Sequence, residues 1–177
     1  MRRTAAEARC VSGVAGSVRD ASFRDIVIRD TRTAVDVVSS WRRGGTGVMF
    51  QDIEFDGLDV DSVLLCRVSP SFAKETRIDG IRFANAKGRV ECPSWITGRQ
   101  DSPVGCVAFD NVSLRHGVVC LNAPEVRIVG GNFARIEPTE LERLTWNRKI
   151  DERDEFPCVF SGPLYDSIQS RRLRFGE

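Results

Sequence analysis

Residues 22–30 read SFRDIVIRD, and three later segments repeat the same pattern of apolar residues, which is apolar-x-x-apolar-x-apolar. These segments are MFQDIEFDG from residue 49, RIDGIRFAN from residue 77 and AFDNVSLRH from residue 108. Their first apolar positions follow one another at intervals of 27 (23 to 50), 28 (50 to 78) and 31 (78 to 109) residues. A steady period of this length predicts a solenoid, in which each coil buries its apolar face only by stacking on its neighbours.

Each repeated segment ends in alternating apolar and polar residues rich in β-branched and aromatic types, which indicates a half-buried strand. A second short strand is expected after a turn in each unit, and these are TAVDVV, DSVLLCRV, GRVEC and GVVCLN. The segment VRIVGGNF around Val126 and Ile128 favours one more coil. We therefore expect an all-β fold, a partial right-handed parallel β-helix with coils over residues 1–136. A β-sandwich is the alternative, because short strands joined by turns look similar strand by strand.

The composition changes from residue 137 onwards. The stretch EPTELERLTWNRKIDERDEF is charged, and it spaces Leu141, Leu144 and Trp146 so that they can cover one face of a short helix. We expect residues 137–177 to form a C-terminal cap on the solenoid or a tail outside it. An uncapped coil exposes unpaired strand edges, so self-association through an open β-helix end is a second expectation.

Composition and charge exclude several classes of partner. A chain of 177 residues with 41% hydrophobic content suits one domain or one piece of a larger unit. Lys and Arg total 26 against 25 for Asp and Glu, which gives no long-range field for nucleic acid or an anionic membrane. No apolar stretch is long enough to span a bilayer. The opening MRRTAAEARC is polar and is not followed by the apolar region of a signal peptide.

The cysteines do not form a metal-binding pattern. Six of them are spread along the chain without a C-x-x-C pair, and there is one histidine, so we expect neither a zinc site nor a cofactor. Cys66, Cys106 and Cys120 lie in or beside apolar runs, where a free thiol acts as a small hydrophobic side chain. For these three we expect buried thiols.

Several phrases resemble a known family. VRDASFRDIVIRDT, GVMFQDIEFDGL, TRIDGIRFANAKGR and CVAFDNVSL are similar to the C-terminal coils of glycoside hydrolase family 28, the polygalacturonases and their relatives. The likeness covers roughly Ala8 to Phe133. It implies a pectin-lyase-like β-helix, a pectin-like polysaccharide substrate, and a location that in this family is mostly secreted or periplasmic.

The resemblance also implies roles for single residues. Arg9 corresponds to the arginine of the family's R-I-K substrate-binding motif, whereas Val11 replaces its lysine. Trp41 stands where the family usually has a tyrosine near the sugar. The N-T-D, D-D and G-H-G segments that hold the family's catalytic acids have no counterpart, because His116 lacks the first glycine and lies downstream of Arg9. We therefore assign no catalytic residue.

Side-chain chemistry by itself singles out Trp41-Arg42-Arg43-Gly44-Gly45 as a binding segment. The indole offers a flat face to a sugar, the guanidinium groups can bind hydroxyls or carboxylates, and the glycines let the backbone approach a ligand. The substrate-binding residues that we expect are Arg9, Trp41, Arg42 and Arg43. An ordinary turn with Trp41 packed on the next coil is the alternative.

Other conspicuous residues suit structural roles better. Asp25 and Asp52 are expected at the same place in successive coils, facing outward and pairing with nearby arginines. Trp95 is expected to pack within a loop inserted in the enlarged unit. Asn85 and Asn111 fit turns or interior stacks of asparagines better than a chemical role.

Two functions remain open at this point. The first is the C-terminal portion of a polygalacturonase-like glycoside hydrolase, inactive alone because its catalytic aspartates are missing. The second is a non-catalytic β-helix that binds carbohydrate or serves as a structural element. In both, the expected partner is a polysaccharide or oligosaccharide, and loss of the motif lysine leaves a neutral glycan as an alternative to a uronide.

Overall fold

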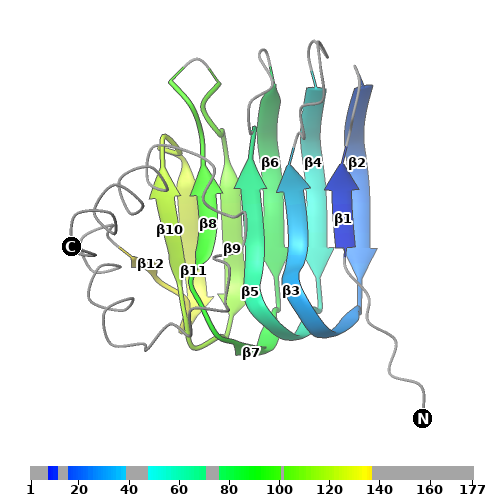
Figure 1. Cartoon of the computed structure of the whole chain (residues 1–177), viewed down its shortest axis with the longest axis vertical. Coiled ribbons are helices and arrows are strands. Elements are labelled where there is room, and N and C mark those ends of the chain that lie inside the picture. Colours follow the sequence, from blue (N-terminus) through cyan, green and yellow to red (C-terminus); the bar gives the residue numbers. More distant parts are fainter. Residues whose placement is uncertain (1–7, 12–15, 39–47, 71–75, 101, 137–177) are drawn as a thin grey trace, which may run out of the picture.

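The computed structural model describes residues 8–11, 16–38, 48–70, 76–100 and 102–136. Within these ranges every helix or strand element is a β-strand, and the strands form two sheets (Figure 1). Sheet A contains β1 (Ala8–Val11), β3 (Val27–Val38), β5 (Asp59–Ser69), β7 (Lys87–Val90), β8 (Ser94–Thr97), β10 (Val118–Leu121) and β12 (Arg135–Ile136). Sheet B contains β2 (Gly16–Arg24), β4 (Val48–Asp56), β6 (Arg77–Ala84), β9 (Val107–Val112) and β11 (Val126–Gly131).

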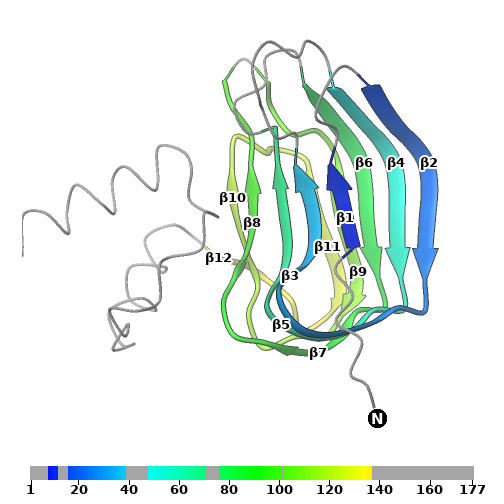
Figure 2. The ribbon, with the colours of Figure 1, turned by 45° about the vertical axis from the view of Figure 1, so that its right-hand side comes forward.

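The chain winds as a parallel β-solenoid. Sheet A runs in the order β1-β3-β5-β8-β10-β12, with β7 also paired to β5, and sheet B in the order β11-β9-β6-β4-β2. All of these ladders are parallel, and the chain passes from sheet B to sheet A in each coil (Figure 2). The all-β parallel β-helix is thereby confirmed, and the β-sandwich, which needs antiparallel sheets, is excluded. The expected cap or tail, residues 137–177, lies outside the described residues, in which no helix could span a membrane.

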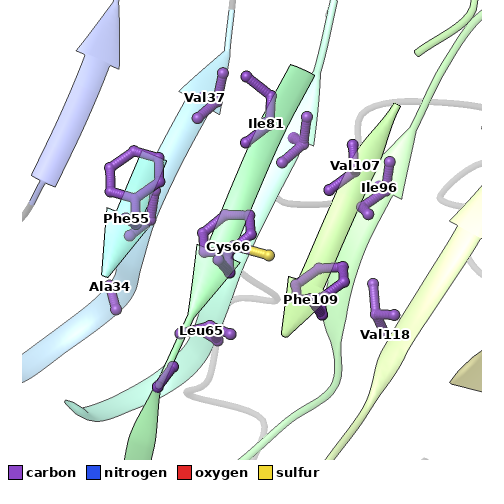
Figure 3. Packing of buried hydrophobic residues seen from close by; sticks show 14 of the residues in the cluster. Ala34, Val37, Phe55, Leu65, Cys66, Ile81, Ile96, Val107, Phe109 and Val118 are labelled. Carbon is purple, nitrogen blue, oxygen red and sulfur yellow. The ribbon is translucent and has the colours of Figure 1, made fainter. Parts of the chain in front are cut away.

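A stack of phenylalanines runs through the interior between the sheets. Neighbouring rings of Phe23, Phe55, Phe83 and Phe109 lie 5.1, 5.2 and 5.1 Å apart between centroids, with interplanar angles of 10°, 14° and 9°. Each coil supplies one ring, so the stack follows the axis of the solenoid. Figure 3 shows Phe55 and Phe109 of sheet B among interior side chains of sheet A such as Cys66 and Val118. Burial of these apolar groups is the main stabilising term of such a fold.

The register between coils differs from the alignment expected from the sequence. Phe23 pairs with Phe55, not with Phe50. The reason is that the apolar-x-x-apolar-x-apolar pattern occurs twice in the first, second and fourth coils, five residues apart. One copy lies in the strand of sheet B, as in 50–55, and the other spans the turn after it, as in 23–28. The sequence comparison matched strand copies in the middle segments with turn copies in the first and last.

A residue in the left-handed backbone region lies at the end of each strand of sheet B or directly after it. These equivalent residues, with their φ angles, are Asp25 (53°), Gly57 (68°), Asn85 (52°), Asn111 (54°) and Gly130 (69°). Glycine, asparagine and aspartate tolerate this conformation best. The Asn111 Nδ2 donates to Asn85 Oδ1 at 2.8 Å. The expected turn role of both asparagines is confirmed, but their contact is exposed, so they do not form an interior stack.

Asp25 and Asp52 do not occupy the same place in successive coils, so that expectation is wrong. Asp25 is equivalent to Gly57. Asp52 is equivalent to Asp20, and each of these two aspartates lies in the middle of its own strand with a positive φ. The error follows from the five-residue shift, because the first segment was aligned through its turn copy.

The third coil differs from the expectation in its second strand. Only the GRV of GRVEC lies in β7, whose sequence is KGRV and which pairs with the first half of β5. The strand β8, with the sequence SWIT, pairs with the second half of β5. Trp95 therefore lies in a strand, not in an inserted loop, and is 4% exposed. Its expected packing role is confirmed.

Candidate functional site

The structure places one of the four expected substrate-binding residues. Arg9 lies in β1, and its Cα is paired with that of Asp36 in β3. Trp41, Arg42 and Arg43 lie outside the described residues. In sequence they follow Val38, the last residue of β3, which pairs with Val11 of β1. Arg9 is thus near a carboxylate-bearing position at the edge of sheet A, and the other three assignments stay predictions.

A polar and aromatic column crosses sheet A beside Arg9. In register, Asp36 of β3 is followed by Arg67 of β5, Trp95 of β8 and Val119 of β10. The neighbours of Asp36, Val35 and Val37, belong to the core cluster of the solenoid. Because successive side chains of a strand point to opposite faces, the column lies on the outer face of sheet A.

Asp36 and Arg67 form a bidentate ion pair within this column. Arg67 Nε donates to Asp36 Oδ1 at 2.7 Å, and Arg67 Nη2 donates to Asp36 Oδ2. The Asp36 side chain is 3% exposed and that of Arg67 is 21% exposed. A carboxylate removed from water to this extent requires a partner, and the planar guanidinium matches both of its oxygens.

Sequence reasoning missed this pair, although a signal for it exists. Asp36 lies in TAVDVV and Arg67 in DSVLLCRV, 31 positions apart (36 to 67), which is about one coil. Opposite charges at equivalent positions of adjacent parallel strands face each other across the sheet. The repeat period therefore predicts the contact once the register is known.

The outer face of sheet B carries a second set of ion pairs, which we call the charge ladder: Arg24, Glu54, Arg82 and Asp110. Arg24 Nη2 donates to Glu54 Oε2 at 3.2 Å. Arg82 Nη1 donates to Glu54 Oε1, and Arg82 Nε donates to Asp110 Oδ2 at 2.7 Å. The ladder therefore alternates positive and negative groups along the axis.

These contacts set the protonation of Glu54. Hydrogen bonds from Arg82 and then from Arg24 hold the pKa of the Glu54 carboxyl below its ordinary value. Hydrogen bonds to Asp110 and to Glu54 raise the pKa of the Arg82 guanidinium. Glu54 is therefore ionised at neutral pH, and Arg82 donates hydrogen bonds to both Glu54 and Asp110.

This arrangement does not suit acid catalysis. An inverting glycosidase needs a neutral carboxylic acid and a carboxylate base, separated by about 6.5–9.5 Å so that a water molecule fits between them. Asp36, Glu54 and Asp110 each accept hydrogen bonds from an arginine, and for Glu54 these contacts hold the pKa of the carboxyl below its ordinary value. In the part of the chain that the structure describes, no cluster of three or more His, Cys, Asp or Glu residues could hold a metal ion.

The thiols follow the expectation in part. Cys66 and Cys120 are buried, and burial raises the pKa of the Cys66 thiol. Cys106 is only half-buried, so its expected burial is wrong. Its place corresponds to that of Gly80, one residue before the interior position shared by Ile81 and Val107.

The fold and these faces define the class of protein as a parallel β-solenoid with ion-paired outer surfaces. No family model, curated protein or solved structure matches the chain. The likeness to glycoside hydrolase family 28 rests on the coil phrases quoted above.

Proposed function

We propose that this chain forms coils of a polygalacturonase-like glycoside hydrolase, and that its own contribution is to bind a pectin-like or related polysaccharide without cleaving it. The observation that carries the proposal is the pairing of outward carboxylates with arginines within a parallel β-helix. Asp36 is bound by Arg67, and Glu54 and Asp110 share Arg82. A β-helix in which Asp36, Glu54 and Asp110 act as acceptors for arginine is suited to binding more than to proton transfer at these three carboxylates.

The proposed contact residues are Arg9, Trp41, Arg42 and Arg43. Arg9 is the neighbour of Asp36 in register, and the bidentate contact with Arg67 already satisfies the Asp36 carboxylate. Burial of Asp36 therefore does not require a second guanidinium. In the proposal, Arg9, Arg42 and Arg43 bind carboxylates or hydroxyls of the polysaccharide, and Trp41 packs on a sugar ring.

The same ion pairs support a second candidate, a non-catalytic β-helix that binds carbohydrate independently of any hydrolase. Both candidates share the contact residues and the substrate class. They differ in whether hydrolysis occurs when the chain is joined to coils that carry carboxylic acids.

Binding to polygalacturonate and to a neutral glucan, measured by calorimetry, tests the proposal. We expect Trp41→Ala to weaken binding by at least about tenfold, about 1.4 kcal/mol. A double Arg42→Ala and Arg43→Ala variant should lose the salt-sensitive part of the affinity for polygalacturonate. Arg89→Ala is the matched control, because Arg89 is an exposed arginine of β7, with a side chain 74% exposed. If these variants and the unmodified chain bind both glycans with equal affinity, Trp41, Arg42 and Arg43 are not contact residues.

A further inference from the structure

The first coil of the solenoid exposes part of its interior. Val18, Ala21, Phe23 and Ile26 are only partly buried, although their side chains pack against the core. The residues at the same positions in the next coil, each 0% exposed, are Phe50, Ile53, Phe55 and Leu58. The difference arises because the first set has a neighbouring coil on one side only, in the part of the chain that the structure describes.

Both sheets end at this side in an edge strand. β2 is the last strand of sheet B and β1 the last of sheet A, and the blue strands in Figures 1 and 2 mark this end of the stack. Most of the β2 residues are exposed. A row of unpaired backbone groups at a sheet edge is a template for another strand.

The two ends of the phenylalanine stack differ. Phe23 stacks nearly parallel on Phe55 through one face. At the other end Phe133 is tilted by 42° to Phe109 and is 5% exposed. The backbone N–H groups of Asn132 and Phe133 donate to the carbonyl oxygen of Val112 at 3.1 and 3.2 Å, so a turn closes this end. The Phe23 end has the geometry of a stack that continues.

Charge also distinguishes this end. The charge ladder alternates in sign from Asp110 through Arg82 and Glu54 to Arg24, whose side chain is 67% exposed. Continued by one coil, the same alternation requires an acidic residue against Arg24.

We propose that the end formed by β1 and β2 binds one coil of another parallel β-helix polypeptide. Its strand adds in parallel to β2, with a large apolar or aromatic side chain over Phe23 and an acidic side chain against Arg24. This partner goes beyond the proposed function and does not depend on glycan binding.

Two copies of this chain fit the end less well. At the far end, Arg127 and Val129 occupy the positions that correspond to Ser22 and Arg24 in β2. Copies stacked head to tail would therefore place Arg127 near Arg24, without an acid. Two copies joined through their β2 strands would bring Arg24 and the other arginine of each β2 to the same interface, where like charges repel.

The test uses a synthetic peptide of residues 48–69 with Cys66→Ser, which carries Glu54 and Phe55 in the register that faces Ser22 and Phe23. A matched peptide carries Glu54→Arg in addition. Hydrogen exchange of the β2 amides is measured on the full chain by mass spectrometry, with each peptide.

We expect the acidic peptide to slow exchange in β2 by about tenfold and the Glu54→Arg peptide to have a smaller effect. An Arg24→Glu variant of the chain should reverse this preference. No protection at millimolar peptide, or equal protection by both peptides, would overturn the proposal. Protection that rises with chain concentration alone would assign the end to a second copy and would also overturn it. Glycan affinity is measured separately. Loss of peptide binding with glycan binding retained would overturn only the proposed coil partner and not the proposed function.

Discussion

Asp52 and Gly80 occupy equivalent positions in neighbouring coils, and a carboxylate oxygen of Asp52 lies where a side chain at Gly80 would begin. A Cβ atom on Gly80 would be 2.5 Å from Asp52 Oδ1. The φ angles of the two residues are 53° and 66°. The same relationship links Asp25 with Gly57, where the distance is 2.7 Å. At these two places an aspartate with positive φ in one coil faces a glycine in the next coil. The absence of a Cβ on the glycine lets the two coils stack closely.

Gly80→Ala should destabilise the chain more than Gly130→Ala. Both glycines have positive φ, which costs an alanine about 1–2 kcal/mol. Only Gly80 adds a clash, which we expect to cost about 1–3 kcal/mol more, because a Cβ on Gly130 would meet no atom closer than 3.7 Å. Urea unfolding of the two variants measures the difference, and equal losses would mean that the Asp52 side chain moves aside freely.

The Asp36–Arg67 pair should show strong coupling in a double-mutant cycle. Asp36→Leu or Arg67→Met alone removes one partner of this ion pair on sheet A, at an expected cost of about 3–5 kcal/mol. The double variant should cost less than the sum of the two, with a coupling energy of about 1–3 kcal/mol. Chemical unfolding gives all four stabilities. Additive losses would show that the two side chains do not depend on each other.

The sequence predicts the solenoid but not the register between its coils. The solenoid was predictable because the apolar pattern recurs in every coil, and the stacking of Phe55 on Phe83 follows from the 28-residue interval between the second and third segments. The register was not, because the pattern around Phe23 matches either of two places in a coil. The Asp36–Arg67 pair depends on that register, so it was missed too. The sequence predicts a loop at Trp95 because GRVEC has the pattern of the second strand of its coil.

Glu54 should contribute to stability at neutral pH and lose that contribution in acid. Its folded pKa lies below the ordinary value of 4.5, so the unfolded chain binds the proton first. The contribution is complete above 4.5 and is lost as the pH falls through the folded pKa. Glu54→Gln should therefore lower stability at pH 7 and have little effect in strong acid. Urea unfolding across this range, with the exposed Glu125→Gln as control, measures it; a pH-independent difference would contradict the ion-pair origin.

The cysteines should differ in their reaction with alkylating reagents. Cys66 is fully buried and its thiol pKa is raised, and both effects reduce the thiolate available for reaction. Cys92 and Cys106 are half-buried, so they should be modified before Cys66 and Cys120, the two buried cysteines of the described residues. Peptide mass spectrometry after timed labelling gives the order. Labelling of Cys66 at the rate of Cys92 would show that the interior opens on the time scale of the reaction.

The central claim is that this β-helix binds a polysaccharide and does not cleave it. Release of reducing ends from polygalacturonate by the purified chain tests this claim most directly, with binding measured on the same preparation and an active polygalacturonase as positive control. The account predicts binding that depends on Trp41 and no release above the blank. Sustained release that is lost in Glu54→Gln or an Asp110→Asn variant would contradict it, because a carboxylate described here as an acceptor for Arg82 would then act as a catalyst.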